Sequence, residues 1–172
     1  MTFDEAFTRL IGLEAGLTMD PRDSGNWTGG AVNVGMLRGT KYGISAATYP
    51  HLDIAHLTLD DARKIYMDDW WIKAGADQMD AAIVYQLWAF AVNAGMETSK
   101  RLLQRAVGGI AEDGRIGPMS IAAINKQSVT DVIMKFSSEC LFYYTSRSGW
   151  PTFGKSWTNR TAAQLKYAAK DA

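Results

Sequence analysis

The sequence predicts a mainly helical α+β protein with one small β element near residues 26–45. Most apolar residues recur at the spacing of amphipathic helices, and residues typical of helix starts precede several of these segments. A glycine-rich stretch between residues 26 and 39 interrupts this helical pattern. With 172 residues, of which 47% are hydrophobic, the chain is long enough to bury a real core.

The segment 2–16 predicts the first amphipathic helix. Thr2 and Glu5 fit a capping box, and Gly16 fits the left-handed residue just past a helix C-terminus. The buried stripe of this helix is expected to contain Phe3, Phe7, Leu10 and Ile11. The next position on the same stripe holds Glu14, so an acid stands where an apolar side chain is expected.

Glu14 is therefore a candidate general acid. An ionised carboxylate is costly to bury without a partner, so such a group tends to keep its proton near neutrality and can donate it in catalysis. Two alternatives remain from the pattern alone: a structural pair with a buried arginine, or a side chain that reaches solvent as the helix frays before Gly16.

A second carboxylate and a hydroxyl follow in the chain. Asp20 and Asp23 lie in the loop after the first helix, and Thr40 follows the glycine-rich stretch. A glycosidase that uses water needs one group to protonate the leaving oxygen and another to activate or orient the water, which a hydroxyl can help to hold. The alternative is structural, since Asp-Pro and Asp-x-Gly sequences are ordinary turn formers.

Three segments carry a specific resemblance. Residues 14–17 (Glu-Ala-Gly-Leu), 20–25 (Asp-Pro-Arg-Asp-Ser-Gly) and 40–44 (Thr-Lys-Tyr-Gly-Ile) resemble the glycoside hydrolase family 108 endolysins, the N-acetylmuramidases of phages and prophages. Ala15 and Leu17 depart from the second glycine and the aromatic residue of the family motif. The segment 26–39 resembles an insertion, whose composition suits either a short β-hairpin at the lip of a cleft or a flexible loop.

The resemblance implies a lysozyme-like fold and hydrolysis of the β-1,4 bond between N-acetylmuramic acid and N-acetylglucosamine in bacterial peptidoglycan. Glu14 would donate the proton, Asp23 would position or deprotonate the water, and Thr40 would support that water. One loop carboxylate with a supporting hydroxyl favours inversion at the anomeric carbon. The expected substrate contacts are Asp20, Tyr42, Trp71 and Asn93. No cofactor is implied.

The second half extends the resemblance. Residues 80–95, 102–108 and 113–118 are similar to the predicted peptidoglycan-binding region of the same family. We therefore expect a catalytic lobe at 1–79 and a helical region at 80–172 packed onto it. The 113–118 segment lacks the further oxygen ligands and closing glutamate of an EF-hand, so it predicts a structured turn, with Pro118 starting the next helix.

Helix-start signals at Thr58 and Ser128 predict two more helices, and residues 149–157 predict a turn-rich link into a final helix. The aromatic residues between Tyr66 and Trp71 fit either a sugar-binding groove or the core, with one tryptophan of the 70–71 pair packing inward. Asn93 fits a helix-end cap or a sugar contact.

Composition excludes several classes of function. Eighteen basic and 18 acidic residues balance to a net charge of zero, which gives no indication of nucleic-acid binding. Cys140 is alone and is expected to be a buried thiol, and His51 and His56 have no cysteine cluster beside them, so no metal site is expected. Locally basic residues in the tail suit either a solvated helix face or contact with an anionic wall polymer.

The chain contains no long apolar run and no signal-peptide pattern at its N-terminus. We therefore expect no stable membrane insertion. We also expect a monomer. It would be made in the host cytoplasm and act on the cell wall after release through a holin or a similar route.

Three rival functions remain. A lytic transglycosylase would need only the acid and would release a 1,6-anhydro sugar, whereas a chitinase would use the same acid on chitin oligomers. The non-enzymatic alternative is a wall-binding or virion structural module, in which Glu14 has no catalytic role.

Overall fold

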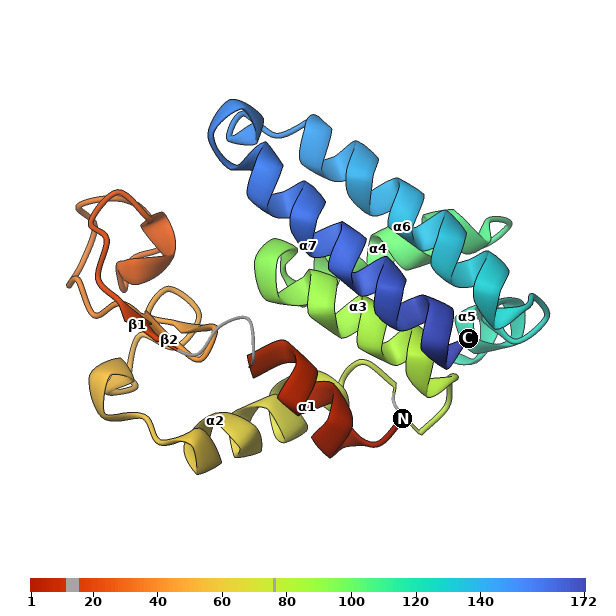
Figure 1. Cartoon of the computed structure of the whole chain (residues 1–172), viewed down its shortest axis with the longest axis horizontal. Helices are drawn as coiled ribbons and strands as arrows, with labels where there is room; N and C mark the ends of the chain where they lie inside the picture. The colour runs from red at the N-terminus through yellow and green to blue at the C-terminus, as the bar shows by residue number, and fades with distance from the viewer. Residues whose placement is uncertain (12–15, 76) are drawn as a thin grey trace. The chain divides into compact units, whose positions relative to one another are not determined.

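In the computed structural model, the described residues are 1–11, 16–75 and 77–172, and they divide into two compact units (Figure 1). The N-terminal unit comprises residues 2–69, and the C-terminal unit comprises residues 70–172 together with Met1. Each unit has its own elements and its own packing, and we describe them separately.

Helix α1 (Phe3–Ile11) opens the N-terminal unit. Its capping box is formed as expected: the Thr2 amide donates to Glu5 Oε2 at 2.7 Å, and the Glu5 amide donates to Thr2 Oγ1 at 3.3 Å. Its buried residues are Phe3, Ala6, Phe7 and Leu10. The Phe7 ring meets the ring of Tyr66 edge to face at 6.0 Å. Glu14 lies outside the described residues.

The small β element is a three-stranded antiparallel sheet in the order β1 (Leu17–Thr18), β2 (Thr40–Lys41), β3 (Ile44–Ser45). Thr18 pairs with Thr40, and Lys41 pairs with Ile44. The expected mainly α fold with a small β element is confirmed. The glycine-rich segment between β1 and β2 is hairpin-like, with one bridge between Trp27 and Leu37 and further bonds such as the Thr28 amide to the Met36 carbonyl.

The N-terminal unit continues with short helices. The 3-10 helices η1 (Ser24–Asn26) and η2 (Ile54–His56) are followed by α2 (Leu59–Ile65). The π-helical turn η3 (Tyr66–Trp71) begins in this unit, and its last two residues belong to the C-terminal unit. Thr58 caps α2 through a reciprocal capping box with Asp61, as its position in the sequence predicts. The fully buried Tyr66 donates its hydroxyl to the carbonyl of Tyr42 at 2.9 Å, which fixes the turn between β2 and β3.

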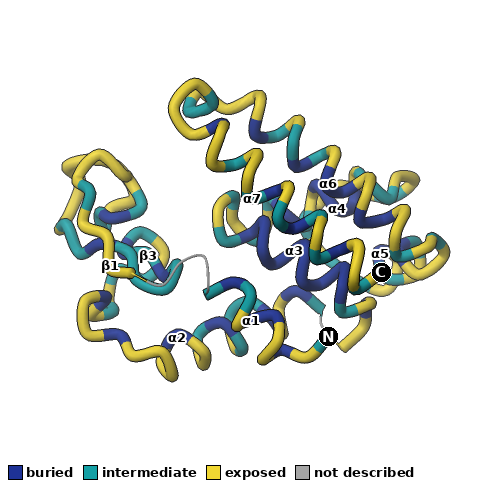
Figure 2. The backbone as a smooth tube through the Cα atoms, in the orientation of Figure 1, coloured by how far each residue is buried: buried dark blue, intermediate teal, exposed yellow. Residues whose placement is uncertain are grey.

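The C-terminal unit is helical: α3 (Ala81–Ala94), α4 (Met96–Val107), α5 (Pro118–Ile124), α6 (Val129–Thr145) and α7 (Trp150–Asp171). Helix α3 is its central element, because α4, α6 and α7 all pack against it and every residue from Ala82 to Ala91 is buried (Figure 2). Phe90 packs against the rings of Phe136, Tyr143 and Tyr144 at centroid distances of 5.1–5.9 Å. Cys140 is buried beside them, and burial raises the pKa of its thiol.

The expected turn-rich link at 149–157 is wrong, because α7 already begins at Trp150. Pro151 lies in the first helical turn, where its missing N–H breaks no hydrogen bond. Gly154 is a packing glycine rather than a turn glycine, since a Cβ there would lie 2.8 Å from the ring of Trp150. Among the described residues, no helix is both long and apolar enough to cross a membrane.

The 113–118 segment is a structured turn that leads into α5 at Pro118, as expected. The buried Gln104 holds it: Nε2 donates to Asp113 Oδ1 at 2.9 Å, and Oε1 accepts from the Gly114 amide at 2.8 Å. One amide side chain therefore supplies both a donor and an acceptor to a turn that is otherwise polar.

Candidate active site

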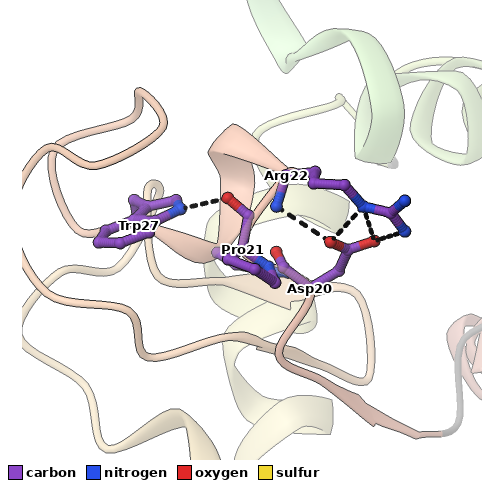
Figure 3. Close-up of polar contacts among 5 residues, drawn as sticks. Asp20, Pro21, Arg22 and Trp27 are labelled. Carbon is purple, nitrogen blue, oxygen red and sulfur yellow. Dashed lines mark hydrogen bonds and ion pairs between the residues drawn. The ribbon is translucent and has the colours of Figure 1, made fainter.

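The loop between β1 and η1 is organised by Asp20 (Figure 3). Its carboxylate makes a two-pronged pair with Arg22, from Nε to Oδ1 at 2.9 Å and from Nη2 to Oδ2 at 2.8 Å, and Oδ1 also accepts from the Arg22 amide. These hydrogen bonds lower the pKa of Asp20 to about 2. Trp27 closes the same loop by donating Nε1 to the Pro21 carbonyl at 2.9 Å. Asp20 thus has a structural role here, and its substrate contact stays a prediction.

Asp23 lies at the start of η1, with its side chain exposed. Its Oδ1 accepts a 2.8 Å hydrogen bond from the Gly25 amide, as an N-capping aspartate does. Among the residues that the structure describes, nothing pairs with Oδ2. One oxygen therefore fixes the orientation of the carboxylate, and the other can accept a hydrogen bond from water.

Asn26 is a polar side chain with 0% exposure at the end of η1. Its Nδ2 donates to the Asp20 carbonyl at 2.9 Å, and its Oδ1 accepts from Thr40 Oγ1 at 2.7 Å. Its own amide donates to the Asp23 carbonyl at 3.1 Å, and its carbonyl accepts from the amides of Arg38 and Gly39. Asn26 thus joins the aspartate loop to the strand that carries Thr40.

Thr40 and Tyr42 belong to the second strand and its turn. Thr40 is half-buried on β2, and its hydroxyl is directed by Asn26. Tyr42 has a φ of 53°, a left-handed conformation that a side chain rarely adopts, and it is held there by the hydrogen bond that its carbonyl accepts from Tyr66. Lys41 Nζ lies 5.4 Å from the centroid of the Tyr42 ring.

The remaining candidates lie elsewhere in the chain. Trp71 belongs to the C-terminal unit, where it is 9% exposed and meets the ring of Trp88 edge to face at 5.5 Å. This is the inward-packing tryptophan that the pair at 70–71 suggested. Asn93 is exposed in the last turn of α3. The substrate contacts expected of Trp71 and Asn93 stay predictions.

Asn26 is the residue that sequence reasoning missed. Within a glycine-rich stretch, an asparagine is indistinguishable from an ordinary turn residue. Its significance comes from contacts 6 and 14 positions away in the chain, to Asp20 and Thr40.

Comparison with known proteins decides the family. The glycosyl hydrolase 108 model matches residues 7–95, just over half of the 172 residues. The chain belongs to the glycosyl hydrolase 108 family. It is also similar to the structure of Brucella abortus SagA, with a TM-score of 0.86 and 25% sequence identity, over 98% of this chain and 94% of that one. No curated protein matches the sequence.

Membership makes this protein a glycoside hydrolase with a lysozyme-like, mainly helical fold. The matched segment includes Glu14, Asp23 and Thr40, the three residues with expected roles in the chemistry. Residues 96–172 lie beyond the match, so their expected part in peptidoglycan binding stays a prediction.

Proposed function

We propose that this glycoside hydrolase is a peptidoglycan muramidase that cleaves the β-1,4 bond between N-acetylmuramic acid and N-acetylglucosamine. Glu14 is the general acid that protonates the leaving oxygen. Asp23 either takes a proton from the attacking water or orients that water, and the Thr40 hydroxyl supports the same water.

One observation carries the proposal. Asp23 and Thr40 are 17 positions apart in the sequence, yet both are tied to Asn26, Asp23 through its carbonyl and Thr40 through its hydroxyl. Among the described residues, Asp23 also has one carboxylate oxygen without a hydrogen-bond partner. Two residues tied to the same asparagine, one with a carboxylate and the other with a hydroxyl, support the placement of one water against a sugar.

Inversion at the anomeric carbon is the proposed outcome. In inverting enzymes a water lies between the two carboxyl groups, which are about 6.5–9.5 Å apart, whereas the nucleophile of a retaining enzyme lies about 5–5.5 Å from the acid. Proton NMR of the first-formed anomer tests this directly. An initial α-anomer supports inversion, and an initial β-anomer contradicts it.

The decisive experiment is mass spectrometry of muropeptides from a wall digest, run beside the Glu14→Gln protein. The wild type should release products with reducing N-acetylmuramic acid ends, and Glu14→Gln should release none while keeping the wild-type Tm. Removing the proton donor should lower the rate by at least about 10²–10⁴-fold. Full activity of Glu14→Gln would remove the acid from the mechanism.

The same digest separates the rival functions. Products ending in 1,6-anhydro sugars would identify a lytic transglycosylase, and cleavage of chitin oligomers without cleavage of wall would identify a chitinase. Wall binding by both proteins with no cleavage by either would favour a structural module.

We also propose that residues 80–172 contribute to wall binding and that the protein acts as an endolysin, reaching the wall through a holin or a similar route. The exposed cations of α7, including Lys155 and Lys170, support contact with an anionic polymer. Co-sedimentation of the Glu14→Gln protein with purified walls tests the binding. Replacing both lysines with glutamate should weaken wall binding, and the difference from the parent protein should be smaller at high salt.

A further inference from the structure

We propose that Asn26 is a positioning residue that makes the Thr40 hydroxyl an acceptor, not a donor, toward the attacking water. The inference rests on the proposed function and deepens it, because it assigns a direction to each hydrogen bond at the water. It follows from two hydrogen bonds of a fully buried side chain.

The orientation of the Asn26 amide is fixed by the Asp20 carbonyl. A carbonyl oxygen can only accept, so the amide atom 2.9 Å away from it is the NH₂ group, Nδ2. The other amide atom, Oδ1, therefore faces Thr40 Oγ1 at 2.7 Å. Since Oδ1 can only accept, the single hydroxyl proton of Thr40 must be donated to it.

With its proton committed to Asn26, the Thr40 oxygen can offer only lone pairs to a further partner. Asp23 Oδ2 is likewise an acceptor, since an ionised carboxylate carries no proton. A water held by both groups must donate both of its protons to them, which leaves its lone pairs directed toward the sugar. The water is thereby oriented as a nucleophile, and Asp23 is the group that takes its proton.

Asn26 also fixes where these acceptors lie. Its main-chain amide donates to the main-chain carbonyl of Asp23 at 3.1 Å. Its main-chain carbonyl accepts from the main-chain amides of Arg38 and Gly39, immediately before Thr40. Losing the side chain removes the bonds to Asp20 and Thr40 and should disturb the chemical step more than substrate binding, because neither side-chain amide atom of Asn26 is exposed to a ligand.

A double-mutant cycle between Asn26 and Thr40 tests the inference, with kcat and KM measured on a soluble oligosaccharide of alternating N-acetylglucosamine and N-acetylmuramic acid. Thr40→Val keeps the shape and removes the hydroxyl, and should lower kcat by about 10–100-fold with little change in KM. Asn26→Ala should lower kcat by a similar factor. Thr40→Ser keeps the hydroxyl and should retain most of the activity.

The variant that combines Asn26→Ala with Thr40→Val tests whether Asn26 acts through Thr40. If Asn26 acts through the Thr40 hydroxyl, then Asn26→Ala in the Thr40→Val background should cost less than about threefold further in kcat. If the two losses multiply, Asn26 is only structural and the inference is overturned. Thr58→Ala is the control, because it removes a hydrogen-bonded side chain of the same unit that caps α2, and it should lower Tm while leaving kcat unchanged.

Asn26→Asp keeps the cycle informative if Asn26→Ala does not fold. The introduced carboxyl group, when protonated, can donate to the Asp20 carbonyl and accept from Thr40, whereas its ionised form has no proton to donate. Both forms can still accept the Thr40 hydroxyl proton, so Asn26→Asp should lower Tm through the lost bond to the Asp20 carbonyl while keeping most of the wild-type kcat. A loss of kcat as large as that of Thr40→Val overturns the inference.

Failure of this inference can be distinguished from failure of the proposed function. Wild-type turnover by Glu14→Gln would reject the proposed mechanism as a whole. Inactive Glu14→Gln together with multiplicative losses in the Asn26 and Thr40 cycle would reject only the inference about Asn26.

Discussion

The two units of the molecule are stabilised in different ways. Around the candidate site, the N-terminal unit has two-residue strands and a three-residue 3-10 helix, and its loops are fixed by hydrogen bonds to the buried Asn26. The C-terminal unit has helices of 12–22 residues packed around α3 and a set of contacting aromatic rings. Hydrogen bonds are directional, whereas apolar burial is not. Substitutions should therefore affect chemistry in the first unit and stability in the second.

The largest expected effect is at Asp23. Asp23→Asn keeps an oxygen for the Gly25 amide but cannot take a proton, so kcat should fall by about 10²–10⁴-fold at unchanged Tm. Asp20 is poorly suited to replace it, because both of its oxygens are paired with Arg22 and these hydrogen bonds lower its pKa to about 2. Steady-state kinetics and thermal melts measure the two quantities. Near wild-type kcat in Asp23→Asn would exclude Asp23 as the base.

The next largest effect should be on stability, at Phe90. This side chain is 1% exposed and packs against three aromatic rings, so Phe90→Ala should lower the free energy of unfolding by about 3–5 kcal/mol. Phe90→Leu, which leaves a smaller cavity, is the control and should cost clearly less. Urea unfolding measures both. A loss below about 1 kcal/mol for Phe90→Ala would contradict the view that burial dominates this unit.

An intermediate effect on both properties is expected at Gly39, which precedes Thr40. Its φ is +82°, and a Cβ there would lie 2.5 Å from the Thr18 carbonyl oxygen on the neighbouring strand. Gly39→Ala should cost about 2–4 kcal/mol, because backbone strain adds to a clash, and it should also lower kcat by displacing Thr40.

Gly108→Ala is the matched control for Gly39→Ala. Its φ is +72° and nothing lies within 4 Å of the added Cβ, so it should show the strain alone, about 1–3 kcal/mol, with kcat unchanged. Equal losses at the two glycines would show that the contact with β1 contributes nothing.

The smallest effect is expected at Arg22, and it should depend on pH. The pKa of Asp20 is lowered from 3.8 to about 2 in the folded state, mainly by its side-chain hydrogen bonds with Arg22. The pair therefore stabilises the fold above the unfolded-state pKa, and this contribution is lost as the pH falls from about 4 to about 2. Arg22→Met should lower Tm at neutral pH, and only slightly, because solvent screens this exposed pair. The difference from wild type should shrink as the pH falls through about 4 toward about 2 and vanish below that, and a constant difference would exclude the ion pair as its cause.

Much of the fold was predictable because its signals are local. The capping residues Thr2, Thr58 and Ser128 and the helix-starting Pro118 act on backbone groups within a few residues. Signals of this kind failed at 149–157, where Gly and Pro imply a turn but Gly154 instead makes room for the Trp150 ring inside a helix. The same residue type has two uses, and only its neighbours in space distinguish them.

The sequence by itself determined the helical architecture and the family, because apolar periodicity and a short run of chemically necessary residues are both written along the chain. It also nominated Asp23 and Thr40. Only the tertiary structure decided that the Asp20 carboxylate pairs with Arg22 and that Trp71 packs in a core. It also decided that Asn26 links Asp20 to Thr40. The reason is physical: hydrogen-bond direction and burial depend on which groups meet in space, and spacing along a chain does not specify that.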